Sequence, residues 1–155
     1  MEIKESHNEN NNNEYKIRNF YIDDYHKCIG ELLNQLSPFK IENIEQIKEY
    51  YCFVNSSKNQ YHYVIEHDNI IVCTASLIIE KKIIHNFKSV GHIEDLVVHK
   101  NYRKRGLAKK MINKLIEICK NNNCYKVILN CNKKCILFYE KLNFVNKNVE
   151  MSLYF

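Results

Sequence analysis

The chain has no apolar run long enough to cross a membrane. A membrane-spanning helix takes about 20 consecutive apolar residues, and no segment of the 155 residues approaches that length. The N-terminal stretch MEIKESHNENNNNEY also lacks the apolar core of a targeting signal. We therefore expect a cytoplasmic protein with no membrane partner.

The chain also has no compact cysteine framework, although it contains seven cysteines. An odd number of scattered thiols suits a reducing compartment, where cysteines pack as small hydrophobic side chains. Cys131 and Cys135 are separated by three residues and have no second ligand pair, which makes them a poor zinc site. We predict no disulfide and no bound metal.

Proline is almost missing, with Pro38 as the only one, and the chain is too short for two ordinary domains. Residues 1–14 are polar and rich in asparagine, so we expect a disordered tail there. Residues 15–155 hold enough apolar side chains for one domain. The net charge of +5 fits nucleic acids, phosphorylated metabolites and nucleotide cofactors alike.

The periodicity of apolar residues predicts an α/β or α+β domain with a single sheet. A helix between two strands favours parallel pairing, whereas the three β-rich runs before it form an antiparallel meander with a turn at His67-Asp68-Asn69. The expected elements are a strand at 15–20, a helix capped by Asp23 or Asp24 that ends near Pro38, a helix at 41–54, strands at 61–67, 70–84 and 90–98, a helix at about 104–121, a strand at 124–131, a short helix at 133–142, and a closing strand or hairpin at 143–155.

Two adjacent acids, Glu94 and Asp95, interrupt the apolar run GHIEDLVV. In a regular strand they would point to opposite faces of the sheet, and burying either without a partner is costly. One interpretation is a structural salt bridge with a core lysine. The other is a local bulge that opens the strand and directs the carboxylates into a ligand cleft.

The segment RKRGLAKK, residues 103–110, begins a helix directly after this acidic strand. A helix N-terminus carries free amides and a positive potential that can hold a phosphate group. Gly106 and Ala108 would let the backbone approach that group closely. A solvated helix start is the alternative, but the position after the acidic strand favours the phosphate site.

These motifs resemble a known family. The order of a strand, R-x-x-G-x-A, an amphipathic helix, a strand and FYEKLNF resembles the GNAT acetyltransferase superfamily over about residues 15–155. Within it, LIIEKKIIH, GHIEDLVV, CYKVILNC, FYEKLNF and VEM resemble the glucosamine 6-phosphate N-acetyltransferases in order and spacing. The resemblance implies a mixed, splayed sheet with helices on both faces, acetyl-CoA as co-substrate, a sugar-phosphate acceptor, a homodimer and no nucleic-acid partner.

The resemblance also implies a role for individual residues. Glu94 and Asp95 would hold the sugar and its amine, and Asp95 or its bound water would help to remove the ammonium proton. The carbonyl of Asn130 would orient the amine, and Tyr139 would protonate or stabilise the departing thiolate. The cofactor-binding residues are Leu96, Val97, Val98, Arg103, Lys104, Arg105, Gly106, Leu107, Ala108, Lys109, Cys135 and Tyr139. The substrate-binding residues are Ser37, Lys82, His85, Glu94, Asp95, Tyr125 and Lys126, some of them across a dimer interface.

The chain departs from the family pattern at several positions. The family usually carries glycine where Lys104 stands and often where Ala108 stands, an asparagine in place of Cys135, an aspartate in place of Asn130, and an arginine in place of Tyr154. The Asn130 role uses a backbone carbonyl and so tolerates the change. Cys135 is either a reactive thiol near the cofactor or an inert buried one.

Other functions fit part of the pattern. A GNAT enzyme could acetylate a protein N-terminus, a lysine or a polyamine, although Lys82 and His85 favour a sugar phosphate. A nucleic-acid-binding module could use the basic run at residues 100–110, but this leaves the two acids and Tyr139 without a role. A catalytically inactive sensor would bind acetyl-CoA without turnover.

Overall fold

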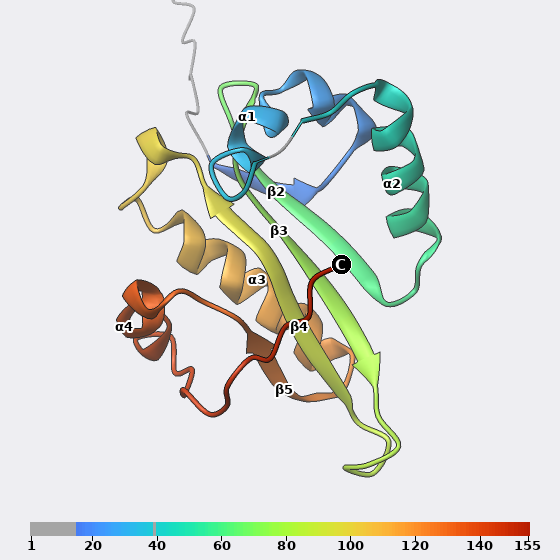
Figure 1. The fold of residues 1–155 in the computed structure, drawn as a ribbon, viewed down its shortest axis with the longest axis vertical. Coiled ribbons are helices and arrows are strands. Elements are labelled where there is room, and N and C mark those ends of the chain that lie inside the picture. The colour runs from blue at the N-terminus through green and yellow to red at the C-terminus, as the bar shows by residue number, and fades with distance from the viewer. Residues whose placement is uncertain (1–14, 39) are drawn as a thin grey trace, which may run out of the picture.

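The computed structural model describes residues 15–38 and 40–155, so the tail expected at residues 1–14 lies outside the described residues (Figure 1). A five-stranded sheet in the order β1-β2-β3-β4-β5 forms its centre. The strands are β1 (Lys16–Asn19), β2 (Gln60–His67), β3 (Ile70–Lys81), β4 (Ser89–Val98) and β5 (Cys124–Leu129). The helices are α1 (Ile29–Leu33), α2 (Ile44–Ser56), α3 (Leu107–Asn121) and α4 (Ile136–Glu140), with 3-10 turns η1 (Ile22–His26), η2 (Lys100–Tyr102) and η3 (Lys133–Cys135).

The pairing of the strands confirms the expected meander and crossover. Strands β1 to β4 pair antiparallel, and β5 pairs parallel to β4 after the crossover through α3. Asp68 and Asn69 turn the β2–β3 hairpin with φ of 49° and 60°, a conformation that short polar residues tolerate well. The sheet is therefore mixed, with a single parallel pair at one edge.

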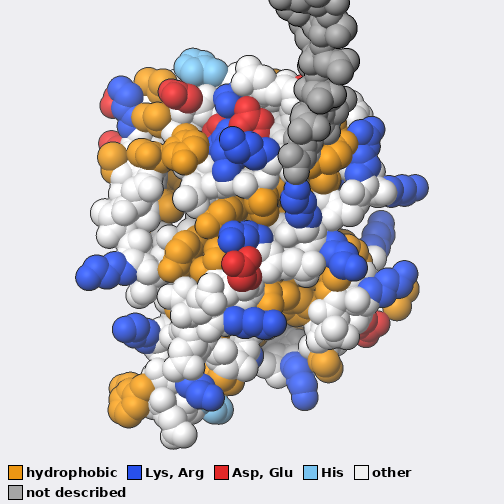
Figure 2. All heavy atoms as spheres, turned by 180° about the vertical axis from the view of Figure 1, so that it is seen from behind, with side chains coloured by type: hydrophobic (Ala, Val, Ile, Leu, Met, Phe, Trp, Pro, Cys, Tyr) orange, Lys and Arg blue, Asp and Glu red, His pale blue; other side chains and the backbone are white. Residues whose placement is uncertain are grey.

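Helix α3 covers one face of the sheet. Its buried residues Leu107, Met111 and Leu115 recur at helical spacing and pack in one cluster with Leu77 and Ile93. On its solvent side, basic side chains are spread over this face of the molecule (Figure 2). Helix and sheet approach most tightly at Gly91, where an added Cβ would lie 2.3 Å from Cys119 Sγ.

The opposite face divides into a covered and an uncovered part. Ile29, Leu32 and Ile47 of α1 and α2 bury a second cluster with Phe20 and Val64. Further along the strands, towards the β3–β4 hairpin, Figure 1 shows no helix in front of the sheet, and Ile78 of β3 is 39% exposed. Helices thus lie on both faces, as expected, and no helix of the described chain covers the hairpin end of this face (Figure 1).

The prediction of one continuous helix between residue 23 and Pro38 is wrong. It breaks into η1 and α1 because Cys28 between them adopts a left-handed conformation with φ of 62°. Asp24 does not cap it from outside: its carboxylate lies inside η1, accepts the Tyr21 amide at 2.8 Å and pairs with Arg18 at 2.6 Å. The buried ion pair fixes the short turn instead of a long helix.

The closing strand or hairpin expected at residues 143–155 is also wrong. No strand occurs there in the described chain. Alternate apolar side chains remain exposed, and they are Val149, Met151, Leu153 and Phe155. A strand forms only with a hydrogen-bonded neighbour, and β5 pairs with β4 alone. Residues 149–155 therefore have the alternating pattern of a strand, but no strand of the described chain pairs with them.

Candidate active site

The two acids lie on a bulge in β4. Thr74 of β3 pairs with Val97 and Ser76 pairs with Glu94, so that Asp95 and Leu96 together oppose Ala75. Asp95 takes the extra position, in a left-handed conformation with φ of 52°. Such a conformation costs about 1 kcal/mol or more for a residue with a side chain. The structure therefore confirms a bulge.

The sheet splays open next to this bulge. Pairing between β4 and β5 runs from Ser89 to Ile93 and ends with the Ile93–Leu129 pair. Beyond it, β4 continues to Val98 while the chain after Leu129 turns away into η3 and α4. Among the described residues, no strand therefore lies beside one edge of residues 94–98, which leaves backbone groups for a ligand.

The carboxylates of Glu94 and Asp95 are not held in an ion pair by the described residues. Asp95 is exposed and Glu94 partly buried, and neither forms an ion pair with a cation in residues 15–38 or 40–155. The structural salt bridge is thus absent from the described chain. Burial, and then the charge of Asp95, raises the pKa of Glu94. Two adjacent unpaired carboxylates favour a cationic ligand such as an ammonium group.

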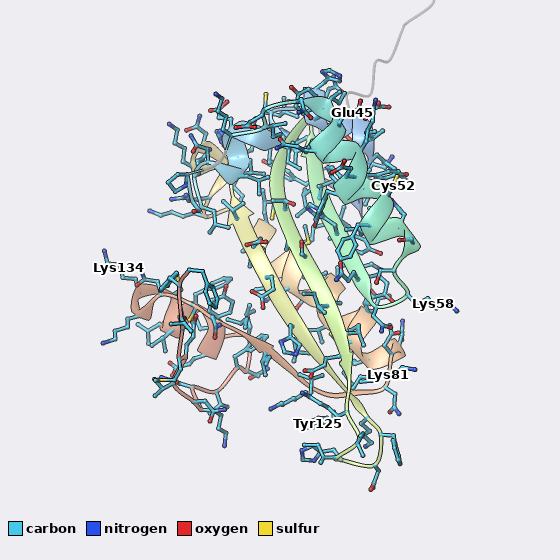
Figure 3. All side chains as sticks on the ribbon, turned by 45° about the vertical axis from the view of Figure 1, so that its right-hand side comes forward. Glu45, Cys52, Lys58, Lys81, Tyr125 and Lys134 are labelled. Atoms are coloured by element: carbon cyan, nitrogen blue, oxygen red, sulfur yellow. The ribbon has the colours of Figure 1, made fainter. Side chains whose placement is uncertain are left out.

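Four of the expected substrate-binding residues gather at the hairpin end of the sheet. Lys82 pairs with Glu80, and His92 lies 2.9 Å from the same carboxylate. The His85 ring packs on Tyr125 at 4.2 Å between centroids, and Lys126 Nζ lies 5.5 Å from the Tyr125 ring. Figure 3 shows Lys81 and Tyr125 together at this end. Cations and an aromatic ring thus adjoin the open face.

Ser37 does not join this group within one chain. It follows α1, which lies at the end of the sheet opposite the hairpin (Figure 1). Its amide donates to the Leu33 carbonyl at 3.2 Å, as in a frayed helix end. A direct role for Ser37 beside the hairpin therefore requires a second chain.

The loop before α3 has the backbone expected of an anion site. Gly106 precedes the helix with φ of 77°, and Lys104 adopts φ of 63°. The left-handed backbone explains why glycine suits position 104 in the family. Arg105 donates to the Tyr15 hydroxyl at 2.7 Å and Arg103 donates to the Val98 carbonyl at 3.1 Å. These bonds hold the loop against β4 and the start of the domain.

Tyr139 lies in α4 on the far side of the splay. Its ring packs edge-on against Phe138 and Phe144, with centroids 5.1 Å and 5.8 Å away. Burial, followed by Cys131 and Cys135, raises the pKa of Tyr139 to about 12. The phenol therefore keeps its proton at neutral pH. Cys135 ends η3 and is exposed, which argues against an inert buried thiol.

Tyr50 is a polar residue at this site that the sequence did not reveal. It projects from α2, and its hydroxyl lies 3.4 Å from Ser76 Oγ, directly across from Glu94. The helical spacing in this segment joins Ile47 and Tyr51, which pack in the cluster around Phe20. It gave no signal for Tyr50, because the direction of a residue beside the apolar stripe depends on how the helix docks.

A cavity of about 580 Å³ lies elsewhere, beside α1. Its lining contains none of the expected site residues and consists of Tyr25, Cys28, Gly30, Glu31, Asn34, Lys40 and Ile41. Within the described ranges, no helix is long and apolar enough to span a membrane, and no three metal-ligating side chains cluster. The bulge, the splay and the two acids therefore define the stronger candidate.

Comparison with known proteins identifies the family of the chain. The model of the acetyltransferase (GNAT) family matches residues 14–144. The chain belongs to the GNAT acetyltransferase family. The crystal structure of glucosamine-6-phosphate N-acetyltransferase from Arabidopsis thaliana superposes with a TM-score of 0.88 at 38% identity, covering 92% of this chain and 99% of that one. The GNAT fold expected from the sequence is therefore confirmed.

Curated relatives agree with that structure. The chain is 39% identical over 136 residues to glucosamine 6-phosphate N-acetyltransferase 1 of Dictyostelium discoideum, covering 86% of each chain. It is 36% identical over 139 residues to the Candida albicans glucosamine 6-phosphate N-acetyltransferase, covering 88% of this chain and 93% of that protein. A Clostridium acetobutylicum acetyltransferase solved with acetyl-CoA shares the fold at 19% identity, with a TM-score of 0.72. The nucleic-acid-binding alternative is not favoured.

Proposed function

We propose that the protein transfers an acetyl group from acetyl-CoA to the amine of glucosamine 6-phosphate, giving N-acetylglucosamine 6-phosphate and CoA for UDP-N-acetylglucosamine biosynthesis. The observation that carries the proposal is the β4 bulge, which presents the unpaired Glu94 and Asp95 at the mouth of the β4–β5 splay. Relatives named for this reaction match across most of the chain. The proposal includes a cytoplasmic location, which the free cysteines of the described residues support.

Acetyl-CoA fits the splay and the loop beside it. The backbone groups of Leu96, Val97 and Val98 would pair with the pantetheine arm, because that edge of β4 has no strand partner. The first amides of α3 at residues 107–109 lack intrahelical acceptors, and the basic loop at 103–106 adds positive charge. Together they would hold the pyrophosphate. When bound, acetyl-CoA supplies the reactive thioester.

The residues around the bulge would then perform a direct transfer. Glu94 and Asp95 attract the ammonium, Asp95 or its water accepts one proton, and the Asn130 carbonyl orients the free amine. Nitrogen bonds to the thioester carbon as the carbon–sulfur bond breaks. Tyr139 donates its proton, or a hydrogen bond, to the departing sulfur, since its phenol is protonated at neutral pH. No covalent enzyme intermediate is needed.

The hairpin end would recognise the phosphate of the sugar. Lys82, His85, Tyr125 and Lys126 supply positive charge and hydrogen-bond donors there. Glu80 holds the Lys82 ammonium, which limits its rotamers before substrate arrives. This arrangement favours a phosphorylated sugar over a neutral one.

A homodimer would complete the site. Residues 149–155 alternate apolar and polar side chains, and their apolar members are exposed in one chain. Glu150 is among the groups that raise the pKa of Glu94, so this segment passes near the acids. Adding it as a strand to a second copy would bury its apolar side chains and bring Tyr154 to a shared site. Ser37 could reach the sugar phosphate in the same way.

Release of free CoA from acetyl-CoA tests the proposed function. Glucosamine 6-phosphate should support turnover far better than glucosamine, glucosamine 1-phosphate, spermidine or a lysine peptide. Preference for the polyamine or peptide would replace the sugar-phosphate assignment with another acetyltransferase. Sedimentation of the full chain and of a chain ending at Asn148 tests the dimer, which only the full chain should form.

A further inference from the structure

We propose that Tyr50 is a further acceptor-binding residue, whose phenol hydroxyl hydrogen-bonds a hydroxyl group of the sugar that Glu94 and Asp95 hold by its amine. The inference rests on the proposed function and deepens it. It assigns to α2 a part in the selection of a polyhydroxylated amine.

The position of the Tyr50 hydroxyl relative to the acids is the first argument. Ser76 and Glu94 are direct partners across β3 and β4, so their side chains lie on one face of the sheet. The Tyr50 hydroxyl lies 3.4 Å from Ser76 Oγ on that face. It therefore adjoins the carboxylates at the point where β4 bulges.

The ring is held firmly while its hydroxyl is free to bind a ligand. Phe20 and His62 pack edge-on against the ring, with centroids at 6.2 Å and 5.5 Å, yet Tyr50 stays 38% exposed. A separation of 3.4 Å is long for two hydroxyl oxygens, whose bonds are usually about 2.7–2.8 Å. Tyr50 and Ser76 thus keep most of their donor and acceptor capacity for a third group.

The electrostatics keep Tyr50 a hydrogen-bond donor. Burial raises the pKa of Tyr50, the Ser76 hydroxyl lowers it, and the nearby Asp95 charge raises it again. The phenol therefore carries its proton throughout the physiological range. A protonated phenol beside two carboxylates can donate to a sugar oxygen without adding charge.

This chemistry separates sugars from other amines. Carboxylates alone attract any ammonium group, including those of lysine and spermidine. Neutral hydroxyls such as those of Tyr50 and Ser76 favour a ligand that offers hydroxyl groups close to its amine. Tyr50, Ser76 and Glu94 offer both kinds of contact on one face, and the Asp95 charge lies near enough to act on Tyr50.

The test compares Tyr50→Phe with the matched control Tyr51→Phe, which removes a phenol hydroxyl from the next residue of the same helix. Tyr51 packs into the cluster around Phe20. We expect kcat/KM for glucosamine 6-phosphate to fall about 3- to 10-fold in Tyr50→Phe, the range for one neutral hydrogen bond. In Tyr51→Phe it should stay at the wild-type value. The affinity for acetyl-CoA should not change in either variant.

Deoxy analogues of the acceptor supply the second measurement. Glucosamine 6-phosphate lacking the 3-hydroxyl or the 4-hydroxyl is assayed with wild type and Tyr50→Phe. One analogue should lose activity with wild type and show no additional loss with the variant, which identifies the bonded hydroxyl. Additive losses with both analogues, or wild-type kinetics in Tyr50→Phe, would overturn the Tyr50 role alone. A wild-type enzyme inactive on glucosamine 6-phosphate would overturn the proposed function itself.

Discussion

The two halves of β4 share one strand but have opposite surroundings. Residues 89–93 pair with β3 on one edge and β5 on the other, and most are buried. Residues 94–98 pair with β3 alone after a bulge. The first half is paired on both edges, whereas the second is paired on one edge only. β5 ends at Leu129, opposite Ile93, and the left-handed residue Asp95 follows two residues later in β4.

The contrast shows how one part of a strand can stabilise the fold while another part of the same strand provides a reactive site. Where both edges are paired, side chains determine the strength of the fold. Where one edge is open, backbone groups and unpaired acids become available without a separate loop. Substitutions in the first half should therefore change the free energy of unfolding, and those in or around the second half should change catalysis.

The largest effect is expected at the bulge. Asp95→Asn and Glu94→Gln should each lower kcat/KM about 10²- to 10⁴-fold, because each removes a charge that binds the amine or assists its proton transfer. Acetyl-CoA affinity by calorimetry and the melting temperature should stay near wild type. Normal kinetics in both variants would remove the acids from the reaction.

Ile93, one residue before the acids, should behave in the opposite way. It is 3% exposed and belongs to the core cluster against α3, so Ile93→Ala should lower the free energy of unfolding by about 2–5 kcal/mol. Urea denaturation measures this loss. At low temperature the folded variant should retain wild-type kcat, and a selective loss of kcat without destabilisation would break the proposed division of β4.

The loop beside the open half gives the next effect. Gly106→Val places a β-branched residue at φ of 77°, which should weaken acetyl-CoA binding about 10-fold or more through a strained loop. Nothing lies within 4 Å of the added Cβ, so direct steric overlap within the chain plays no part. In contrast, Lys104→Gly relieves strain at φ of 63° while removing one charge. Calorimetry should show a much smaller change for that variant.

Tyr139→Phe should lower kcat about 10-fold and leave the KM for the sugar nearly unchanged, since the hydroxyl matters most as charge develops on sulfur. The ring would still pack on Phe138 and Phe144. Steady-state kinetics with both substrates measures the split. An unchanged kcat would refute the role in leaving-group stabilisation.

The remaining prediction separates two pH dependences. Burial lowers the pKa of His62 to about 4, below its unfolded value of about 6.5, so only the unfolded state binds a proton between these values. Stability should therefore fall by up to about 3 kcal/mol as pH drops from about 6.5 to 4, and His62→Gln should flatten this loss. The raised pKa of Glu94 should instead limit kcat/KM on the acidic side, and Glu94→Gln should change that limb without changing the denaturation curve.

Much of the fold followed from local patterns, and the misses have physical causes. Alternating apolar residues and the Asp68–Asn69 turn were sufficient for the meander. The two acids in an apolar run left a salt bridge and a bulge open, and the basic segment after them favoured the bulge. The left-handed conformation of Cys28 breaks the expected helix, and the Arg18–Asp24 ion pair joins residues that no local period connects. Residues 149–155 have the pattern of a strand, but pattern alone does not reveal whether a partner lies in the same chain.

The candidate site was predictable only where motifs mark it. The acids, the basic loop and Tyr139 lie within recognisable segments, and their individual roles stay predictions. Tyr50 could not be predicted because its place beside Ser76 depends on the angle at which α2 crosses the sheet. The Glu80–Lys82–His92 contact likewise joins two strands through side chains whose separation depends on register.

Gly91 of β4 and Cys119 of α3 lie so close that the contact fixes the helix against the sheet at this point. Cys119 lies twelve residues after Leu107, so at about 1.5 Å per residue the contact is roughly 18 Å from the loop at residues 103–106 that precedes α3. A larger residue at either position would tilt the helix about this pivot and displace the loop at its far end. Changes distant from every ligand could thus retune cofactor affinity, and the volumes at positions 91 and 119 would have to evolve together.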